Sequence, residues 1–550
     1  ALRCFRRMRD EKVCSPNAMS YASILKACGM VNSLDIGQCI DADIRKEGLL
    51  EKDVVLGTAL VDMYSKCGAL EKAQEVFEHL SVRDVVTWNA LIAGYTQYGL
   101  ADEALECFRK MQDEGACPNS VTYISTLKAC GLARSLEIGK AIDAEVRKQG
   151  LLLKNIALGN TLVGMYAKCG ALEKAEEVFE HMWMRNAVSW NALIGGYVEQ
   201  GLGLKAIKCF RQMQEDEVVC PDTVTYICVL KACGIIRSVE IGEDIHAQVR
   251  KEGLLQKDIM LGTAFVDMYS KCGALEKAGE VFKQLPRQNV VTWNVLITGY
   301  AHHSLGDEVL ECFREMKDEG VCPDVVTYMC VLKASGIVGS VKIGEEIDAE
   351  IRKQSLLPKD VMLGTALLDM YSKCGTLMKS REVFEELPVK SIVPWNALIA
   401  GYAQLGEVNV VLDLYGKMRT QGIMPDSVTF IVLLTACSHA GLLGHGEKVF
   451  EEMLSVHHLT PTVEHYTCMV DLFGRAGHSE KAKGFLDKVS HSDRLPLLLI
   501  ILATCQNWMD VNLGRWAFEQ SIQLDEKCTP AYICMQNIYA ASGMQNIHME

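Results

Sequence analysis

The stretch VVTWNALIAGYTQYGLADEALECFRKMQDEGACPN (Val85–Asn119) decides the fold. Its apolar residues recur at helical spacing as far as Tyr95, Gly99 interrupts the pattern, and a second apolar series runs from Ala104 to Met111. The pattern predicts two helices joined by a tight turn. Because a lone hairpin of this size cannot cover its own apolar face, we expect it to stack against neighbours.

The same hairpin pattern recurs along the whole chain. Four tryptophans follow one another in steps of 102, 103 and 102 residues, at Trp88, Trp190, Trp293 and Trp395. Each long period divides into three shorter units, as in Val85–Asn119, Ser120–Asn155 and Ile156–Asn186. The sequence therefore predicts an all-α fold, an α-solenoid superhelix of tandem helix–turn–helix hairpins with its aromatic and methionine stripes in the core.

Composition limits the classes of partner. The 550 residues contain 56 Lys and Arg against 70 Asp and Glu, a formal net charge of −14, so any nucleic-acid surface must be local. Hydrophobic residues make up 49% of the chain, which excludes a disordered protein. The longest apolar stretch, near Leu495 to Ala503, is too short to cross a bilayer, and we expect no membrane partner.

The 23 cysteines follow the repeat and include no C-x-x-C pair, as in Lys66-Cys67-Gly68. We therefore expect small reduced core residues, no bound metal and no cofactor. The letters His445-Gly446-Glu447 match the H-x-E half of a zinc deaminase motif, but they fall inside an expected helix with no C-x-x-C after them. We predict no catalytic residue, and the chain is not expected to be an enzyme.

Three stretches carry a resemblance to a known family: VVTWNALIAGYTQYG (Val85–Gly99) with CPN (Cys117–Asn119), VTYISTLKACG (Val121–Gly131) and LGTALVDMYSKCGALEKA (Leu56–Ala73). Together they resemble plant pentatricopeptide repeat (PPR) proteins of the PLS class, in which P, L and S repeats alternate. The competing tetratricopeptide repeats have one constant period of about 34 residues, unlike the unequal units here.

The resemblance divides the chain into repeats and implies that it is a fragment without its initiator methionine or targeting peptide. The expected parts are a partial P repeat (1–17), L and S repeats (18–84), three P-L-S rounds (85–186, 187–289 and 290–391), terminal P, L-like and S-like repeats (392–494), an E-like motif (495–530) and a truncated second E-like motif (531–550).

The family resemblance implies that each repeat meets one nucleotide of single-stranded RNA, which its fifth and last residues read. The expected pairs are Thr58 with Asp84, Asn89 with Asn119, Asn160 with Asn186, Asn191 with Asp222, Thr263 with Asn289, Asn294 with Asp324, Thr365 with Ser391, and Asn396 with Asp426. L repeats place apolar Ile124, Ile227, Met329 and Ile431 at the fifth position, which predicts slots without base preference. The alternative for the asparagines is simple helix capping.

Two further series belong to the expected RNA surface. The second residues of P and S repeats, which either stack on bases or pack the start of a helix, are Val55, Val86, Ala157, Val188, Met260, Val291, Met362 and Val393. The thirteenth residues of S repeats, which either follow the phosphates or sit at a helix end for its dipole, are Lys66, Lys168, Lys271, Lys373 and Arg475.

The resemblance implies a targeting factor for C-to-U editing of organellar RNA, in the mitochondrion or alternatively the chloroplast. A missing C-terminal domain, or a deaminase-bearing protein or accessory factor in trans, would supply the deamination. The family code asks, from the S repeat at Val54 onward, for G, pyrimidine, any base, pyrimidine, U, any base, A, U, any base, an unassigned base and U. Alternatives are an organellar RNA processing, splicing or stability factor, and a protein-binding scaffold.

Overall fold

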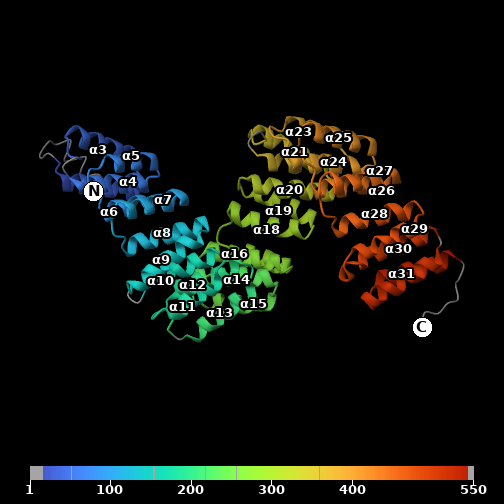
Figure 1. The fold of residues 1–550 in the computed structure, drawn as a ribbon, viewed down its shortest axis with the longest axis horizontal. Helices are drawn as coiled ribbons and strands as arrows, with labels where there is room; N and C mark the ends of the chain where they lie inside the picture. The colour runs from blue at the N-terminus through green and yellow to red at the C-terminus, as the bar shows by residue number, and fades with distance from the viewer. Residues whose placement is uncertain are drawn as a thin grey trace. The chain divides into compact units, whose positions relative to one another are not determined.

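The computed structural model describes residues 16–50, 53–152, 155–216, 218–255, 257–357, 360–508 and 510–542. Every regular element in these ranges is a helix, and no strand occurs among them (Figure 1). Most of the expected partial repeat at 1–17 and the end of the 531–550 motif lie outside the described residues. The chain forms two compact units, Ala1–Gln288 and Asn289–Glu550.

The first unit is a series of helical hairpins, each with a first and a second helix. Its helices are α2 (Ala18–Val31), α3 (Leu34–Lys46), α4 (Val54–Lys66), α5 (Leu70–His79), α6 (Val85–Gln97), α7 (Ala101–Asp113), α8 (Ser120–Ala133), α9 (Leu136–Lys148), α10 (Ile156–Lys168), α11 (Leu172–His181), α12 (Ala187–Glu199), α13 (Gly203–Glu215), α14 (Thr223–Ile236), α15 (Val239–Lys251), α16 (Ile259–Lys271) and α17 (Leu275–Lys283).

The second unit continues the series of hairpins. Its helices are α18 (Val290–His302), α19 (Gly306–Asp318), α20 (Val325–Val338), α21 (Val341–Lys353), α22 (Val361–Lys373), α23 (Leu377–Glu386), α24 (Ile392–Gln404), α25 (Val408–Thr420), α26 (Ser427–His439), α27 (Leu443–Ser455), α28 (Val463–Arg475), α29 (Ser479–Gly484), α30 (Leu495–Trp508), α31 (Val511–Leu524) and α32 (Thr529–Ala541), with 3-10 turns at Leu486–Lys488 and His491–Asp493. The tandem α-solenoid predicted from the sequence is confirmed.

First helices stack on first helices. Within the first unit α6 contacts α4 and α8, and each second helix from α3 to α15 packs on its own first helix and on the first helix that follows. The core between the layers is aromatic, because Trp88 lies edge-on to Phe77 with their ring centroids 4.5 Å apart, and Trp190 lies in the same way against Phe179. Trp88 is only 1% exposed, which confirms the expected aromatic core.

The turns differ between repeat types. In the P repeat at Val85, Gly99 takes a φ of 79°, a left-handed conformation that glycine adopts without strain. In the L repeat, Arg134 makes this turn with a φ of 51°, and the backbone N–H groups of Arg134 and Ser135 both return to the Cys130 carbonyl. Ser135 precedes the second helix but does not cap it, because backbone bonds close the turn and its side chain makes no capping bond.

The described cysteines are buried, half-buried or exposed, and Cys67 of the Lys-Cys-Gly series is half-buried. Cys28, Cys130 and Cys233 are buried, as predicted for small core residues. The prediction is wrong for Cys117, Cys220, Cys322 and Cys39, which are exposed. The first three of these precede a proline in the loop between P and L repeats, where no helix covers them.

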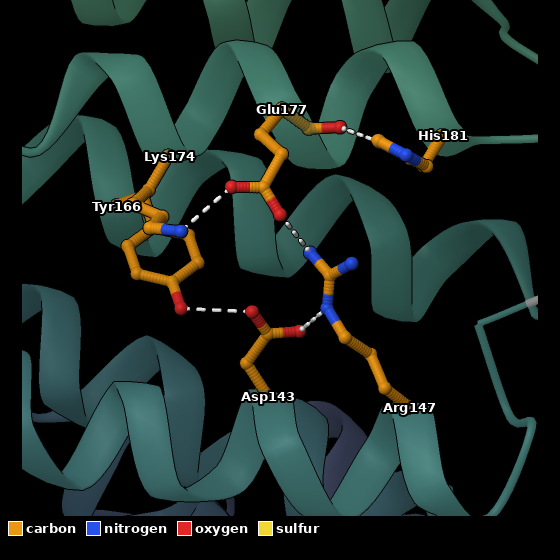
Figure 2. A network of polar contacts seen from close by, with 6 residues as sticks. All are labelled: Asp143, Arg147, Tyr166, Lys174, Glu177 and His181. Carbon is orange, nitrogen blue, oxygen red and sulfur yellow. Dashed lines mark hydrogen bonds and ion pairs between the residues drawn. The ribbon is translucent and has the colours of Figure 1, made fainter.

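A polar cluster ties the L repeat to the S repeat that follows it (Figure 2). The Tyr166 hydroxyl donates to Asp143 Oδ2 at 2.8 Å, and Arg147 Nε donates to Asp143 Oδ1 at 2.9 Å. Arg147 also pairs with Glu177 at 3.4 Å, so the cluster joins α9, α10 and α11. Burial raises the pKa of the Tyr166 phenol and the Asp143 carboxylate raises it further, so the phenol stays protonated and donates.

None of the helices in the described part of the chain is long and apolar enough to cross a bilayer.

Candidate nucleic-acid interface

One face of the first helices is exposed and carries the second residue of each repeat. Helical spacing places the second, fifth, ninth and thirteenth residues on one side of the helix. The fifth residue is much less exposed than the second, at 8–9% for Asn89, Asn294, Thr365 and Asn396. The second residues of the P and S repeats are exposed apolar side chains, with exposed fractions from 48% at Val393 to 72% at Met260. The others of this series are Val55, Val86, Ala157, Val188, Val291 and Met362. Their exposure excludes the alternative that they pack the helix start.

The fifth and last residues of the asparagine-bearing repeats are hydrogen-bonded to each other. In each case the Nδ2 of the fifth residue donates to the Oδ1 of the last. The distances are 3.2 Å for Asn89 to Asn119, 3.2 Å for Asn160 to Asn186, 2.9 Å for Asn191 to Asp222, 2.9 Å for Asn294 to Asp324, and 3.0 Å for Asn396 to Asp426. The structure therefore brings together five of the eight expected pairs in direct contact.

The last residue of each of these repeats is also the N-cap of the following helix. Asp222 Oδ1 accepts from the backbone N–H of Thr225 at 2.8 Å and from its hydroxyl at 2.9 Å, which satisfies one of the free donors at the start of α14. The capping alternative is thus correct for the last residue. The fifth residue, Asn191, does not cap a helix but binds the cap.

The pairs that contain threonine have a different geometry. Thr58 Oγ1 lies 2.9 Å from the Val54 carbonyl and 2.7 Å from Thr87 Oγ1, and the Thr87 hydroxyl donates to Asp84 Oδ1 at 2.7 Å. Thr58 and Asp84 are therefore linked through the hydroxyl of a third residue, Thr87.

The pair of Thr365 and Ser391, which lies within the second unit, shows no such link in the described contacts. The Thr263 and Thr365 hydroxyls donate to carbonyls of their own helices, those of Ile259 and Val361. Thr263 belongs to the first unit, whereas Asn289 caps α18 in the second. Ser391 stands before α24 without a side-chain capping bond.

Hydrogen bonds keep the capping aspartates ionised. Burial acts to raise the pKa of the Asp222 carboxyl, but the Thr225 N–H, Asn191 Nδ2 and the Thr225 hydroxyl all donate to it and hold that pKa below its ordinary value. The same balance lowers the pKa of Asp324 and of Asp426. At neutral pH each offers a fixed negative charge beside an amide.

The S-repeat cations are mostly paired. Lys66 Nζ lies 2.6 Å from Asp62 Oδ2, and an aspartate four residues earlier pairs in the same way with Lys271, Lys373 and Arg475. Lys168 has Gly164 at that place, and no ion pair within the described ranges includes it. The aliphatic stem of each lysine lies against a glycine of the preceding L repeat, as Lys168 does against Gly131.

The H-x-E letters singled out in the sequence lie on a helix of the solenoid. His445 and Glu447 lie on α27, where Glu447 pairs with Lys481 at 3.0 Å. No cluster of three or more metal-ligating side chains occurs in the part of the chain that the structure describes.

Known proteins match the chain along most of its length. A model of the PPR repeat family matches residues 83–131, 185–234, 288–335 and 390–439, and a model of the PPR repeat matches residues 58–85, 160–186, 263–290, 428–457 and 464–492. Pentatricopeptide repeat-containing protein At2g33680 of Arabidopsis thaliana is 35% identical over 98% of this chain and 74% of its own length. The chain belongs to the pentatricopeptide repeat family.

Other PPR proteins of Arabidopsis thaliana show the same degree of likeness. Protein At2g03380, named as mitochondrial, is 32% identical over 96% of this chain and 76% of its own. Protein At1g11290, named as chloroplastic, is 34% identical over 99% of this chain and 66% of its own.

Solved PPR structures share the fold. The crystal structure of PPR10 from maize superimposes with a TM-score of 0.61 at 18% identity, over 99% of this chain and 84% of that one. PPR10 in complex with an 18-nt psaJ RNA element gives a TM-score of 0.51 over 98% of this chain and 85% of that one. At this identity the likeness concerns the fold alone.

The sequence reasoning missed one series of residues in these PPR repeats. The third residue of the following repeat donates its hydroxyl to the Oδ1 of the fifth-position asparagine, as Thr122 does to Asn89 at 2.6 Å. The same bond joins Ser189 to Asn160, Thr225 to Asn191, Thr327 to Asn294 and Thr429 to Asn396. Both ends of each amide are therefore held. The signal was a Thr or Ser two residues after the start of each P or L repeat, which Pro394 replaces in α24.

Proposed function

We propose that this chain binds single-stranded RNA sequence-specifically, as a PPR protein of the PLS class in which each P and S repeat reads one nucleotide. The observation that carries the proposal is an exposed apolar second residue on the same helix face as a fixed polar pair, as with Val188 and the pair of Asn191 and Asp222. Apolar side chains suit the faces of unstacked bases, and amides suit their edges. The RNA complex of maize PPR10 supports the choice of ligand.

The hydrogen bonds also suggest how the last residue selects between pyrimidines. The Oδ1 atom of the last residue accepts the capping bonds, so its second terminal atom is left for the base. That atom is an acceptor oxygen in Asp222 and a donor amide in Asn119. Uracil offers an N–H at N3 where cytosine offers an acceptor, so Asp favours U and Asn admits C. The Nδ2 of Asn191 keeps a second N–H for a base carbonyl.

We propose the base order given by these pairs, from the S repeat at Val54: G, pyrimidine, any base, pyrimidine, U, any base, A, U, any base, unassigned, U. Slots without preference fall on L repeats, where Ile124, Ile227, Met329 and Ile431 present no polar edge. The S-repeat cations would follow the phosphates, with Lys168 the strongest contact because no carboxylate neutralises it.

The biological role that fits this binding is targeting of C-to-U editing in the mitochondrion or the chloroplast. The compartment names of the two Arabidopsis relatives support an organelle. The three helices α30, α31 and α32 stand where the resemblance places E-like motifs. The deaminase would come from sequence beyond Glu550 or from another protein.

Selection from a random single-stranded RNA pool tests the proposal. We expect a consensus in the order above, with the reading pairs in register along the chain. A selected pool without a consensus at the P and S slots would contradict sequence-specific binding and favour the protein-binding scaffold.

A further inference from the structure

The first helix of each complete L repeat carries a single charged side chain. Helices α2, α8, α14 and α20 each contain one lysine and no other Asp, Glu, Lys or Arg. This lysine is always the ninth residue of the repeat, at Lys26, Lys128, Lys231 and Lys333. All four side chains are exposed. A cation therefore recurs once in every P-L-S round, on a helix that is otherwise uncharged.

The position of these lysines places them on the proposed RNA face. In an α-helix the second, fifth and ninth residues lie one above another, because they are three and four residues apart. In α8 these are Val121, Ile124 and Lys128, of which Val121 is 55% exposed and Ile124 is half-buried. The lysine thus lies beside the apolar slot that has no group to read a base edge.

These lysines also differ from the S-repeat lysines in having no acidic partner. Lys66, Lys271 and Lys373 each pair with an aspartate four residues earlier. The corresponding residue before Lys128 is Ile124, which is apolar. No ion pair among the described residues includes Lys26, Lys128, Lys231 or Lys333. Their charge is fully available to a ligand, although the whole chain is acidic.

We propose that the L repeats hold the RNA backbone, with Lys26, Lys128, Lys231 and Lys333 as phosphate contacts. This inference rests on the proposed RNA binding. An ammonium is a point charge that binds phosphate whatever the base, whereas an apolar fifth residue cannot select an edge. P and S repeats then read bases, and each L repeat between them places a positive charge against a phosphate of the strand.

The experiment compares two triple variants of the full chain that lose the same charge from the same three L repeats. The test variant is Lys26→Ala with Lys128→Ala and Lys231→Ala, on the first helices. The control variant is Lys46→Ala with Lys148→Ala and Lys251→Ala, at the ends of the second helices α3, α9 and α15, where the side chains are also exposed. Binding is measured by fluorescence anisotropy across a series of KCl concentrations.

Two RNA probes are used, one with the proposed base order and one of the same composition with the order scrambled. The slope of log binding constant against log salt concentration should be smaller in magnitude by about 2 in the test variant. The reason is that each phosphate contact on a single strand contributes about 0.7 to this slope. The affinity should fall by the same factor for both RNAs. The control variant should keep the slope of the unmodified chain, and a third variant with arginine at the three test positions should keep it too.

The outcomes separate the two proposals. If the unmodified chain binds both RNAs, and the test variant is folded by circular dichroism but has the same salt slope, the phosphate role is overturned. RNA binding itself is then left intact. Equal flattening in the test and control variants also overturns it, because the effect would then follow net charge alone. An unmodified chain that binds neither RNA overturns the proposed function and this inference together. Binding of an acidic peptide that the test variant alone loses, without RNA binding, would assign the lysines to a protein partner.

Discussion

At the scale of single residues, the last residue of a repeat caps the next helix, and in the proposed RNA binding it also faces the base. Asp84 caps α6 by accepting from the Thr87 N–H at 2.8 Å. Asn and Asp cap helices about equally well, so Asp84→Asn should leave the helix in place. The substitution then changes only the atom offered to the nucleotide.

We expect Asp84→Asn to move the preference of the Thr58 slot from G toward A, with a change in discrimination of about 1–3 kcal/mol. The measurement is the Kd for two RNAs that differ only at that base. Asp53→Asn is the control, because Asp53 also caps a helix, by accepting from the Val55 N–H of α4, but ends an L repeat. An unchanged preference in a folded Asp84→Asn protein would show that this slot does not read bases.

Gly164 gives a second test of a single residue. The other S repeats have an aspartate four residues before the cation at the thirteenth position, whereas Gly164 stands there before Lys168. A side chain fits there, since nothing lies within 4 Å of an added Cβ. Gly164→Asp should pair with Lys168 as Asp62 does with Lys66, weaken RNA binding and reduce the salt slope by up to about 0.7. Gly164→Asn, which has the same shape without the charge, should change neither. A slope that Gly164→Asp leaves intact would remove Lys168 from the phosphate contacts.

The capping aspartates predict an acid limit to stability. The pKa of Asp222, Asp324 and Asp426 is lower in the folded chain than in the unfolded one, so their contribution is fully present above the ordinary carboxyl pKa of about 3.9. It is lost as the pH falls through the lowered native values. Replacement of all three by Asn should make helical circular dichroism less dependent on pH below about 4. An identical acid titration of the two proteins would contradict this reasoning.

At the scale of elements, the cluster at Asp143 decides how an L repeat joins an S repeat. Asp143 is 6% exposed and accepts from both Tyr166 and Arg147. Asp143→Ala should cost about 1–3 kcal/mol, because a buried hydroxyl and a guanidinium lose their partner. The round at 187–289 shows a natural replacement, in which His246 Nδ1 lies 3.0 Å from the Tyr269 hydroxyl.

We therefore expect Asp143→His to be milder than Asp143→Ala. Hydrogen exchange should locate the loss in α9, α10 and α11, because each hairpin of a repeat array is stabilised by its nearest neighbours. Thermal unfolding of the two variants provides the order of stability. Equal losses for both, or exchange that rises evenly along the chain, would show that the cluster does not join these helices.

The same elements show what the sequence could and could not predict. The expected repeat starts coincide with helix starts at Val85, Ala187, Val290 and Ile392. This is because both the apolar period and the capping residue can be identified from the sequence alone. The contacts of Thr122 with Asn89, and of Asp143 with Tyr166, join residues of different hairpins. Such contacts depend on how neighbouring helices stack, which a spacing rule for one hairpin does not contain.

At the scale of the whole molecule, net charge and local charge have opposite signs. The chain carries −14, yet α2, α8, α14 and α20 each present one cation and no anion. The acidic residues concentrate on second helices such as α7, with Asp102, Glu103, Glu106 and Asp113. An acidic protein can thus offer a positive strip to one strand while its other faces repel nucleic acid, which would suppress binding elsewhere on the surface.

The constancy of the long period leads to a prediction for the whole array. Residues 187–289 form one P-L-S round, and its removal joins Asn186 to Val290. Asn186 would then cap α18, as Asn289 does in the complete chain, so the junction repeats a contact type that the protein already uses. Because each hairpin contacts only its neighbours, the shortened chain should fold.

We expect the shortened chain to bind an RNA shortened by the three bases that the deleted round reads, U, any base and A. Its order becomes G, pyrimidine, any base, pyrimidine, U, any base, unassigned, U, and the Kd for this RNA should be lower than for the full-length element. Deletion of 187–202 alone is the control, because it removes α12 and leaves the apolar face of α13 without its partner helix. That protein should lose helical content and RNA binding. If the shortened chain folds but still binds the RNA with the complete base order more tightly than the shortened RNA, the reading of one nucleotide by each repeat is contradicted.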